Sequence, residues 1–192
     1  MSALWHHPQK KLTHYPERDE VERTAFAKEL EAYPKAQRVW VDECGVEQNL
    51  YREHARSPRG IKIYADVPDK RFAPRISVVA AYRHGLLLAP LRFEGHTDTF
   101  LFDLWVEQFL VPVLQPDQVV IMDNARFHQS AKTRHFIEAA GCRLLFQPAY
   151  SPDLNKIEHQ WAILKQGIRA NRQTDLSFLE KMDAQLVKMS EP

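Results

Sequence analysis

The segment VVIMDN at residues 119–124 constrains the fold more than any other stretch of this chain. A run of apolar residues without polar alternation is typical of a strand that is buried on both faces of a sheet. Asp123 ends this run, so a carboxylate stands where the predicted strand leaves the core. A second short strand, RVWV at residues 38–41, runs into Asp42 in the same way. The two strands predict an α/β fold with an acidic site at one edge of its sheet.

The other predicted elements place helices and a hairpin around these strands. The first are a helix between Pro16 and Pro34 and a hairpin of residues 75–82 and 85–95, in which Pro90 marks an edge or bulge. A helix capped by Thr97 and ended by Pro112 follows, with one apolar face made of Phe100, Leu101, Leu104, Trp105 and Phe109. Next come a helix capped by Ser130 and ended by Gly141, a strand at 142–147, a helix carrying Leu154, Ile157, Trp161, Leu164 and Ile168, and a weaker helix from Leu176 to about Met189. This order favours an RNase H-like α/β fold, a mixed five-stranded sheet with helices on both faces, although the order alone also permits other α/β folds.

The length of 192 residues suits one domain with a short appendage. We expect an N-terminal linker and helix at 1–36, the RNase H-like domain at 37–173 and a C-terminal helix at 174–192. Two distant cysteines predict neither a disulfide framework nor a zinc site. The first residues lack the apolar core of a signal peptide, and no apolar run is long enough to span a bilayer. We therefore expect a soluble protein of the cytoplasm.

The charge of the chain is balanced overall but uneven along its length. A formal net charge of +1 excludes a global basic excess for nucleic acid. Between residues 52 and 75, however, seven basic residues face three acidic ones: Arg52, Arg56, Arg59, Lys62, Lys70, Arg71 and Arg75 against Glu53, Asp66 and Asp69. This stretch is either a solvated loop or a surface that follows phosphates.

Glu158 is a third acidic residue that could meet Asp42 and Asp123. It lies in the first turn of the predicted helix, with 34 residues between it and Asp123, behind a turn that could return over the same sheet edge. Three carboxylates offer only hard oxygen ligands, which Mg²⁺ or Mn²⁺ prefers. Without a cation they would repel one another and raise each other's pKa. The pattern is that of a two-metal site for phosphoryl transfer.

Each of these residues also has a purely structural interpretation. An Asp followed by Asn at a strand end is a common turn device, and Glu43 competes with Asp42 as a ligand. With Asn155 as N-cap, Glu158 occupies the N3 position of a capping box. His128 and His159 are interpreted as surface or hydrogen-bonding histidines rather than metal ligands.

Three motifs, VDECG, IMDNARFHQS and PAYSPDLNKIEHQWAILK, resemble the catalytic domain of the DDE transposases of the mariner superfamily. The similarity is greatest to the bacterial insertion-sequence branch of the IS-six-thirty type, and it runs from about Thr13 to about Ala170. The spacing of 34 residues between the second Asp and the Glu matches that family.

The resemblance implies that Asp42, Asp123 and Glu158 bind two Mg²⁺ or Mn²⁺ ions. A metal-activated water then cuts DNA at the transposon end, and the freed 3′-hydroxyl attacks the target DNA. The partners implied are transposon ends, target DNA and a second copy of the chain. Three residues would neighbour the metal ligands or shape the turn: Asn124, His128 and Asn155. DNA contacts would come from the basic residues of 52–75 together with Arg126 and Lys156.

Two departures from the family pattern affect this interpretation. Lys156 follows Asn155 where relatives have Pro, and a cation near a helix N-terminus costs about 0.3–1 kcal/mol. Relatives also carry helix-turn-helix units ahead of the catalytic domain, for which residues 1–36 leave no room. We therefore expect a catalytic half whose end-binding part is encoded separately or joined by frameshifting, acting in the cytoplasm of a bacterium, at the nucleoid.

Two other functions are compatible with the same residues. One is a metal-dependent DNA endonuclease with an RNase H-like fold. The other is an inactive or co-opted remnant that binds DNA or protein without turnover.

Overall fold

Five strands form one mixed sheet in the order β3-β2-β1-β4-β5. The computed structural model describes residues 17–47, 58, 62, 75–171 and 174–191. The hairpin strands β2 and β3 pair antiparallel with each other and with β1, whereas β1, β4 and β5 run parallel. The strands span Arg38–Glu47 (β1), Arg75–Arg83 (β2), Leu86–Glu94 (β3), Val119–Met122 (β4) and Arg143–Phe146 (β5). The predicted mixed five-stranded sheet is confirmed.

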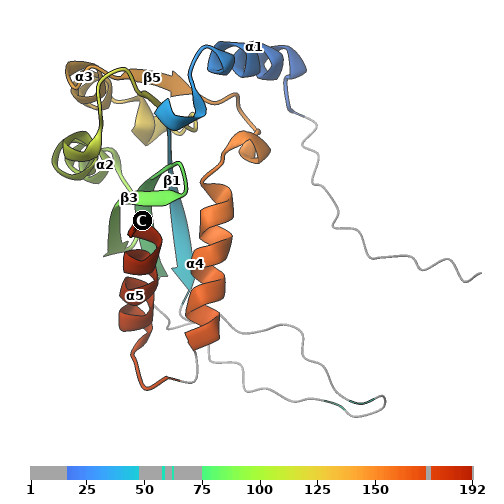
Figure 1. The fold of residues 1–192 in the computed structure, drawn as a ribbon, viewed down its shortest axis with the longest axis vertical. Coiled ribbons are helices and arrows are strands. Elements are labelled where there is room, and N and C mark those ends of the chain that lie inside the picture. Colours follow the sequence, from blue (N-terminus) through green and yellow to red (C-terminus); the bar gives the residue numbers. More distant parts are fainter. Residues whose placement is uncertain (1–16, 48–57, 59–61, 63–74, 172–173, 192) are drawn as a thin grey trace, which may run out of the picture.

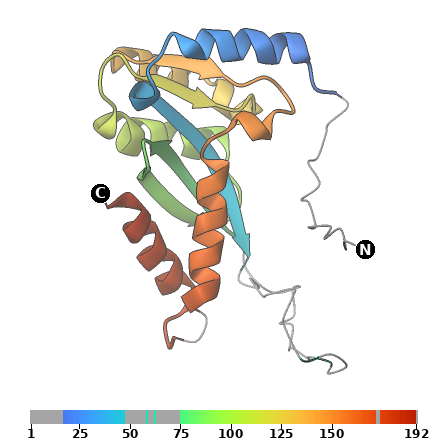
Figure 2. The same cartoon turned by 45° about the vertical axis from the view of Figure 1, so that its right-hand side comes forward.

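Helices cover both faces of this sheet (Figures 1 and 2). They span Glu20–Glu31 (α1), Thr99–Trp105 (α2), Ala131–Ala139 (α3), Glu158–Ala170 (α4) and Phe178–Ser190 (α5). Strand residues alternate between two hydrophobic clusters, as the period of two requires. Trp40 and Ile121 pack with α1, α4 and α5, and Val39 and Val120 pack with α2 and α3. None of the helices in the described ranges is long and apolar enough to cross a membrane.

Most of the predicted helix ends and strand features are confirmed. Ser130 caps α3 by accepting a hydrogen bond from the backbone N–H of Lys132 at 3.1 Å. Gly141, at φ 75°, follows that helix in the left-handed conformation that favours glycine. Pro90 lies in β3, which is an edge strand with an irregular register against β2. A helix at Phe178–Ser190 confirms the weaker helical pattern near the end of the chain.

The predicted cap of α2 was wrong, and of the five residues of its predicted apolar face only Trp105 is buried. Asp98, not Thr97, caps the helix by accepting from the backbone N–H of Leu101 at 2.8 Å. Phe100 is 74% exposed and Phe109 is 41% exposed, whereas Phe102, Trp105, Val106 and Leu110 are buried. The helix itself carries apolar residues on every side, so the periodicity of the sequence could not identify the face that is buried. A π-helical segment at Val106–Leu110 then rotates the face further.

The terminal helices share one core with the sheet. Phe26 and Leu30 of α1, and Met182, Leu186 and Met189 of α5, belong to the cluster that contains Trp40 and Trp161. Figures 1 and 2 both show α5 beside α4. The division of the chain at residues 36 and 173 stays a prediction, but these contacts make α5 part of the packed structure.

We expect Met182→Ala to lower the free energy of unfolding by about 2–5 kcal/mol, because Met182 is fully buried between α5 and the sheet. Val187→Ala is the matched control on the same helix, since Val187 is 56% exposed, and should stay within about 0.5 kcal/mol of the parent. Urea unfolding followed by circular dichroism measures both. Equal, small effects would show that α5 contributes little to the core.

Candidate active site

The two central strands carry Asp42 and Asp123 to the same edge of the sheet. β1 and β4 are parallel neighbours, with Trp40 beside Ile121 in the register. Asp42 and Asp123 each follow two residues later, so they leave the paired region at matching positions. The prediction that these strands are adjacent and parallel is confirmed. Asp42, however, is not at a strand end, because β1 continues to Glu47 by pairing with β2.

Asp42 is half-buried and its carboxylate accepts a hydrogen bond from an indole. Trp161 Nε1 donates to Asp42 Oδ2 at 3.0 Å. Burial raises the pKa of Asp42 to about 7; the Trp161 hydrogen bond opposes the rise, and the charges of Glu43 and Glu158 add to it. Asp42 and Glu158 therefore repel each other, and a cation bound between them would relieve that repulsion.

Asp123 is held from behind by a buried imidazole. His128 Nδ1 lies 2.6 Å from Asp123 Oδ1, and His128 Nε2 lies 2.9 Å from Glu43 Oε1. Burial alone lowers the pKa of His128, but the hydrogen bonds and charges of the two carboxylates outweigh it and raise the pKa to about 10. The imidazolium therefore donates to both. Burial raises the pKa of Asp123, and His128 together with the backbone N–H of Ala125 reverses this, so the pKa is lowered.

Aromatic rings fix the position of His128. Its ring centroid lies 4.4 Å from that of Phe102 and 4.3 Å from that of Phe127. Both donors to Asp123 use Oδ1, and no residue in the described part of the chain donates to Oδ2. The carboxylate is thus oriented through one oxygen, and the other is available to a ligand.

Glu158 is the first residue of α4 and is exposed. The alternative in which it closes a capping box with Asn155 is wrong, because Ile157 is the N-cap of α4 and no side chain caps this end. Asn155 is buried and its Oδ1 accepts from the backbone N–H of Ile157 at 3.4 Å, so it shapes the turn before the helix. The side chain of Glu158 is therefore not engaged in capping.

One pocket of about 430 Å³ is lined by all three acidic residues, Asp42, Asp123 and Glu158. Asn124, Asn155 and the loop from Gln147 to Pro152 complete its wall. Among the described residues, no three His, Cys, Asp or Glu side chains are placed to hold a metal ion. The carboxylates thus share a pocket without converging on one point. Their donor chemistry, oxygen only, fits Mg²⁺ or Mn²⁺.

Comparison with known proteins places this geometry in a family. The model of the DDE superfamily endonuclease family matches residues 37–179. The chain belongs to this family. A segment of 74 residues is 35% identical to the Tc3 transposase of Caenorhabditis elegans. This segment covers 38% of this chain and 22% of that protein.

Solved structures of Mos1 transposase share the DDE fold. The Mos1 paired-end complex with the left transposon end superposes with a TM-score of 0.68 at 16% identity, covering 95% of this chain and 58% of that chain. The catalytic domain of Mos1 mariner transposase superposes with a TM-score of 0.57 at 15% identity, covering 94% and 84%. The predicted RNase H-like fold is confirmed by these matches. The chain spans about a fifth of Tc3 and 58% of the Mos1 chain in the paired-end complex.

The other predicted site residues of this DDE chain lie in different places. Asn124 lines the pocket and accepts hydrogen bonds from Gln129 Nε2 through its Oδ1 at 2.7 Å and its carbonyl at 3.0 Å. Arg126 is exposed just after Asp123, and Lys156 is exposed before α4 but lines a different cavity. Arg75 covers Gly45 beside β1 and does not line this pocket. Of the other basic residues of 52–75, Lys62 is exposed, and Arg52, Arg56, Arg59, Lys70 and Arg71 lie outside the described residues.

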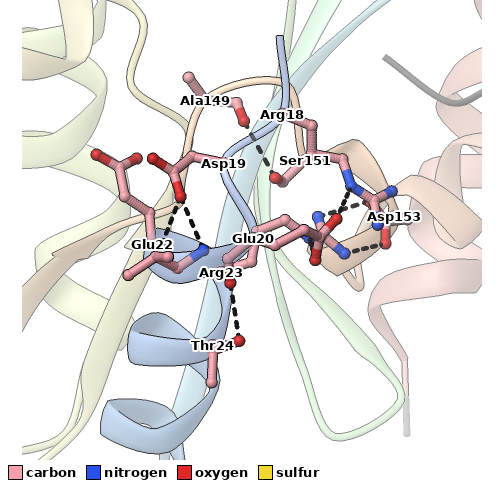
Figure 3. A network of polar contacts seen from close by, with 10 residues as sticks. Arg18, Asp19, Glu20, Glu22, Arg23, Thr24, Ala149, Ser151 and Asp153 are labelled. Carbon is pink, nitrogen blue, oxygen red and sulfur yellow. Dashed lines mark hydrogen bonds and ion pairs between the residues drawn. The ribbon is translucent and has the colours of Figure 1, made fainter. Parts of the chain in front are cut away.

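An ion pair ties α1 to the loop that leads into Glu158. Figure 3 shows Arg23 facing Asp153, with Nη1 to Oδ1 at 3.0 Å and Nη2 to Oδ2 at 2.7 Å. Arg18 and Glu20 extend this network at the start of α1. Neither this pair nor the contacts of Trp161 and Glu43 were predicted, because residues 130 positions apart in sequence give no local signal.

We expect His128→Ala to lower the free energy of unfolding by about 3–5 kcal/mol, because it leaves Glu43 and Asp123 beside a cavity without their shared cation. His135→Ala, at an exposed position of α3, is the control and should stay within about 0.5 kcal/mol. Urea unfolding at neutral pH measures both. A loss no greater than that of the control would mean that the imidazolium bridge does not form in solution.

Proposed function

We propose that this chain is the catalytic part of a DDE transposase of the mariner superfamily, in its bacterial branch of the IS-six-thirty type. One observation carries the proposal: the three acidic residues of the motifs VDECG, IMDNARFHQS and PDLNKIEHQW, which are far apart in sequence, line a single pocket. Membership of the DDE superfamily endonuclease family supports the reaction class. The similar chains Tc3 and Mos1 are themselves transposases by name.

Asp42, Asp123 and Glu158 are proposed to hold two Mg²⁺ or Mn²⁺ ions. Their oxygen ligands suit these ions, and the mutual repulsion of Asp42 and Glu158 favours a cation between them. Mos1 paired-end complexes have been solved with Mn and with Mg. The bound ions would supply Lewis-acid activation of the attacking oxygen and stabilisation of the leaving oxygen at phosphorus.

The chain's own residues supply orientation in this proposal. Trp161 holds one oxygen of Asp42, and His128 holds one oxygen of Asp123, so each carboxylate is positioned by a donor that is itself packed in the core. Arg23 holds the loop before Glu158 through Asp153. To share ions, the three carboxylates must move closer together than they lie here. Asn124 and Asn155 line the same pocket and are proposed to neighbour the metal ligands or to shape the turn before Glu158.

The partners proposed are transposon-end DNA, target DNA and a second copy of this chain on paired ends. The DNA contacts are assigned to Arg126, Lys156 and the basic residues of 52–75, and end recognition to a helix-turn-helix part that is separately encoded or joined by frameshifting. On its own the chain should bind DNA weakly and with strong salt dependence. The compartment proposed is the bacterial cytoplasm, at the nucleoid.

Mn²⁺ should raise the unfolding temperature of the parent chain, because an ion that binds only the folded state stabilises it by mass action, by about 2.7 kcal/mol at a concentration of 100 times Kd. Asp42→Asn, Asp123→Asn and Glu158→Gln should each remove most of this shift. Asp175→Asn, at an exposed position outside the pocket, should retain it. Differential scanning calorimetry with and without Mn²⁺ makes the measurement. A shift that survives all three changes would place the ion elsewhere.

Transposase and nuclease differ in the fate of a 3′-hydroxyl. With Mn²⁺, the chain should join a labelled oligonucleotide to a supercoiled plasmid through that hydroxyl, and Asp123→Asn should reduce joining by at least about 100-fold, on the order of one lost catalytic interaction. Nicking without joining would favour the endonuclease. Metal binding without either product, also after the chain is fused to a DNA-binding domain with its operator on the oligonucleotide, would favour the inactive remnant.

A further inference from the structure

A second cavity, of about 500 Å³, lies next to the pocket of Asp42, Asp123 and Glu158, which we call the acidic pocket, and has a different character. It forms where α1, the start of β1, the β2–β3 turn and the first turn of α4 meet. Its floor is apolar and aromatic, with Phe26, Leu30, Trp40 and Tyr82 among the lining residues. We call it the cationic pocket, because its polar lining residues are Lys35, Arg38, His84, Lys156, His159 and Gln160.

The charge of the cationic pocket has one sign. No Asp or Glu lines it, and none of Lys35, Arg38 and Lys156 forms an ion pair with a carboxylate in the described part of the chain. Arg38 is oriented by donating from Nε to the carbonyl of Tyr33 at 2.9 Å. Three like charges around one cavity repel one another, and an anion bound among them would offset that repulsion.

We propose that the cationic pocket binds one unpaired nucleotide of the DNA strand, with the base on the apolar floor and the phosphate at Lys35, Arg38 and Lys156. An aromatic or apolar surface combined with a cationic rim is the usual way to hold single-stranded nucleic acid, since every base has a face that packs there. A paired base hides its faces in the stack, so the nucleotide that enters must be unpaired or extruded.

The position of the cationic pocket relates it to the acidic pocket. Trp40 and Asp42 point to the same face of β1 and lie two residues apart, about 7 Å along the strand. Lys156 and Glu158 likewise lie within one turn and line the two different cavities. A strand whose phosphate reaches Glu158 could therefore place a nucleotide one to three steps away, at about 3.4 Å or more per step, in the cationic pocket. In naming DNA as the ligand, this inference rests on the proposed function.

Binding of a 5′-phosphorylated single strand and of a duplex of equal length, measured by fluorescence anisotropy in EDTA, tests the proposal. Ala27 is an exposed residue of α1 that lines the cavity, so Ala27→Phe should fill the cavity without removing charge or core. It should weaken single-strand binding by at least about fivefold, the lower end of the effect of losing one stacked base, and change duplex binding less than twofold. Ala184→Phe, at an exposed position of α5, is the matched control and should leave both unchanged.

The phosphate contact has its own test. Lys156→Ala should lower the slope of log affinity against log salt for the single strand by about 0.7, the value for one lost phosphate contact. Lys188→Ala, at an exposed position of α5, should not. Unchanged binding with Ala27→Phe, or an equal loss for single strand and duplex, would overturn the proposal. The proposal would also be overturned if inorganic phosphate or an acidic peptide displaced the strand as well as a thymidine nucleotide does.

Failure of this inference and failure of the proposed function give different results. In EDTA the single-strand affinity does not depend on metal, so the response to Ala27→Phe is measured independently of the Mn²⁺ shift. A chain that keeps the Mn²⁺ shift and strand joining but ignores Ala27→Phe has the proposed function without this pocket. A chain that responds to Ala27→Phe but neither binds Mn²⁺ nor joins strands has the pocket without the reaction.

Discussion

The parallel pairing of β1 with β4 fixes the position of the strand that both cavities share. Val39 beside Val120 and Trp40 beside Ile121 set the register, and all four side chains are buried. Because side chains alternate along a strand, a slip of one residue would turn every one of them to the opposite face. Burying each such side chain is worth about 1.5–3 kcal/mol, so the slip would be opposed by several of these contributions at once. The same register holds Asp42 and Asp123 at matching positions on the same edge of the sheet.

The carboxylates of the acidic pocket are set apart by what lies behind them. Asp123 has a buried imidazolium as a neighbour, which lowers its pKa, whereas Asp42 has burial and two acidic neighbours, which raise its pKa to about 7. Glu43 shares the cation of His128 on the opposite face of β1 from Asp42. Because side chains alternate along β1, the adjacent residues Asp42 and Glu43 have different surroundings. Glu43 becomes part of the packed support, and Asp42 faces the pocket.

The sequence predicted the strands and acidic residues of this site better than the side chains that hold those residues in position. Strand β4 was recognisable because an unbroken apolar run of this length is readily placed in a sheet interior, and Asp123 followed as its end. The Trp161–Asp42 hydrogen bond could not be predicted, because periodicity assigns Trp161 to the core and says nothing about where its N–H points. His128 was interpreted as a hydrogen-bonding or surface residue, and it is buried by the rings of Phe102 and Phe127 together with Glu43 from a distant strand. The length of β1 depended on β2, which pairs with it although the two strands are distant in sequence.

The segment from Asp153 to His159 shows how one departure from a family pattern can be tolerated. Lys156 stands where relatives have Pro, yet α4 begins at Glu158, so the lysine lies before the helix and outside the turn where a cation is most unfavourable. The rigidity that Pro would supply comes from other contacts. Arg23 binds Asp153 at one side, and Asn155 accepts from the backbone N–H of Ile157 at the other. With the turn held in this way, position 156 can carry a charge into the cationic pocket while Glu158, two residues later, faces the acidic one.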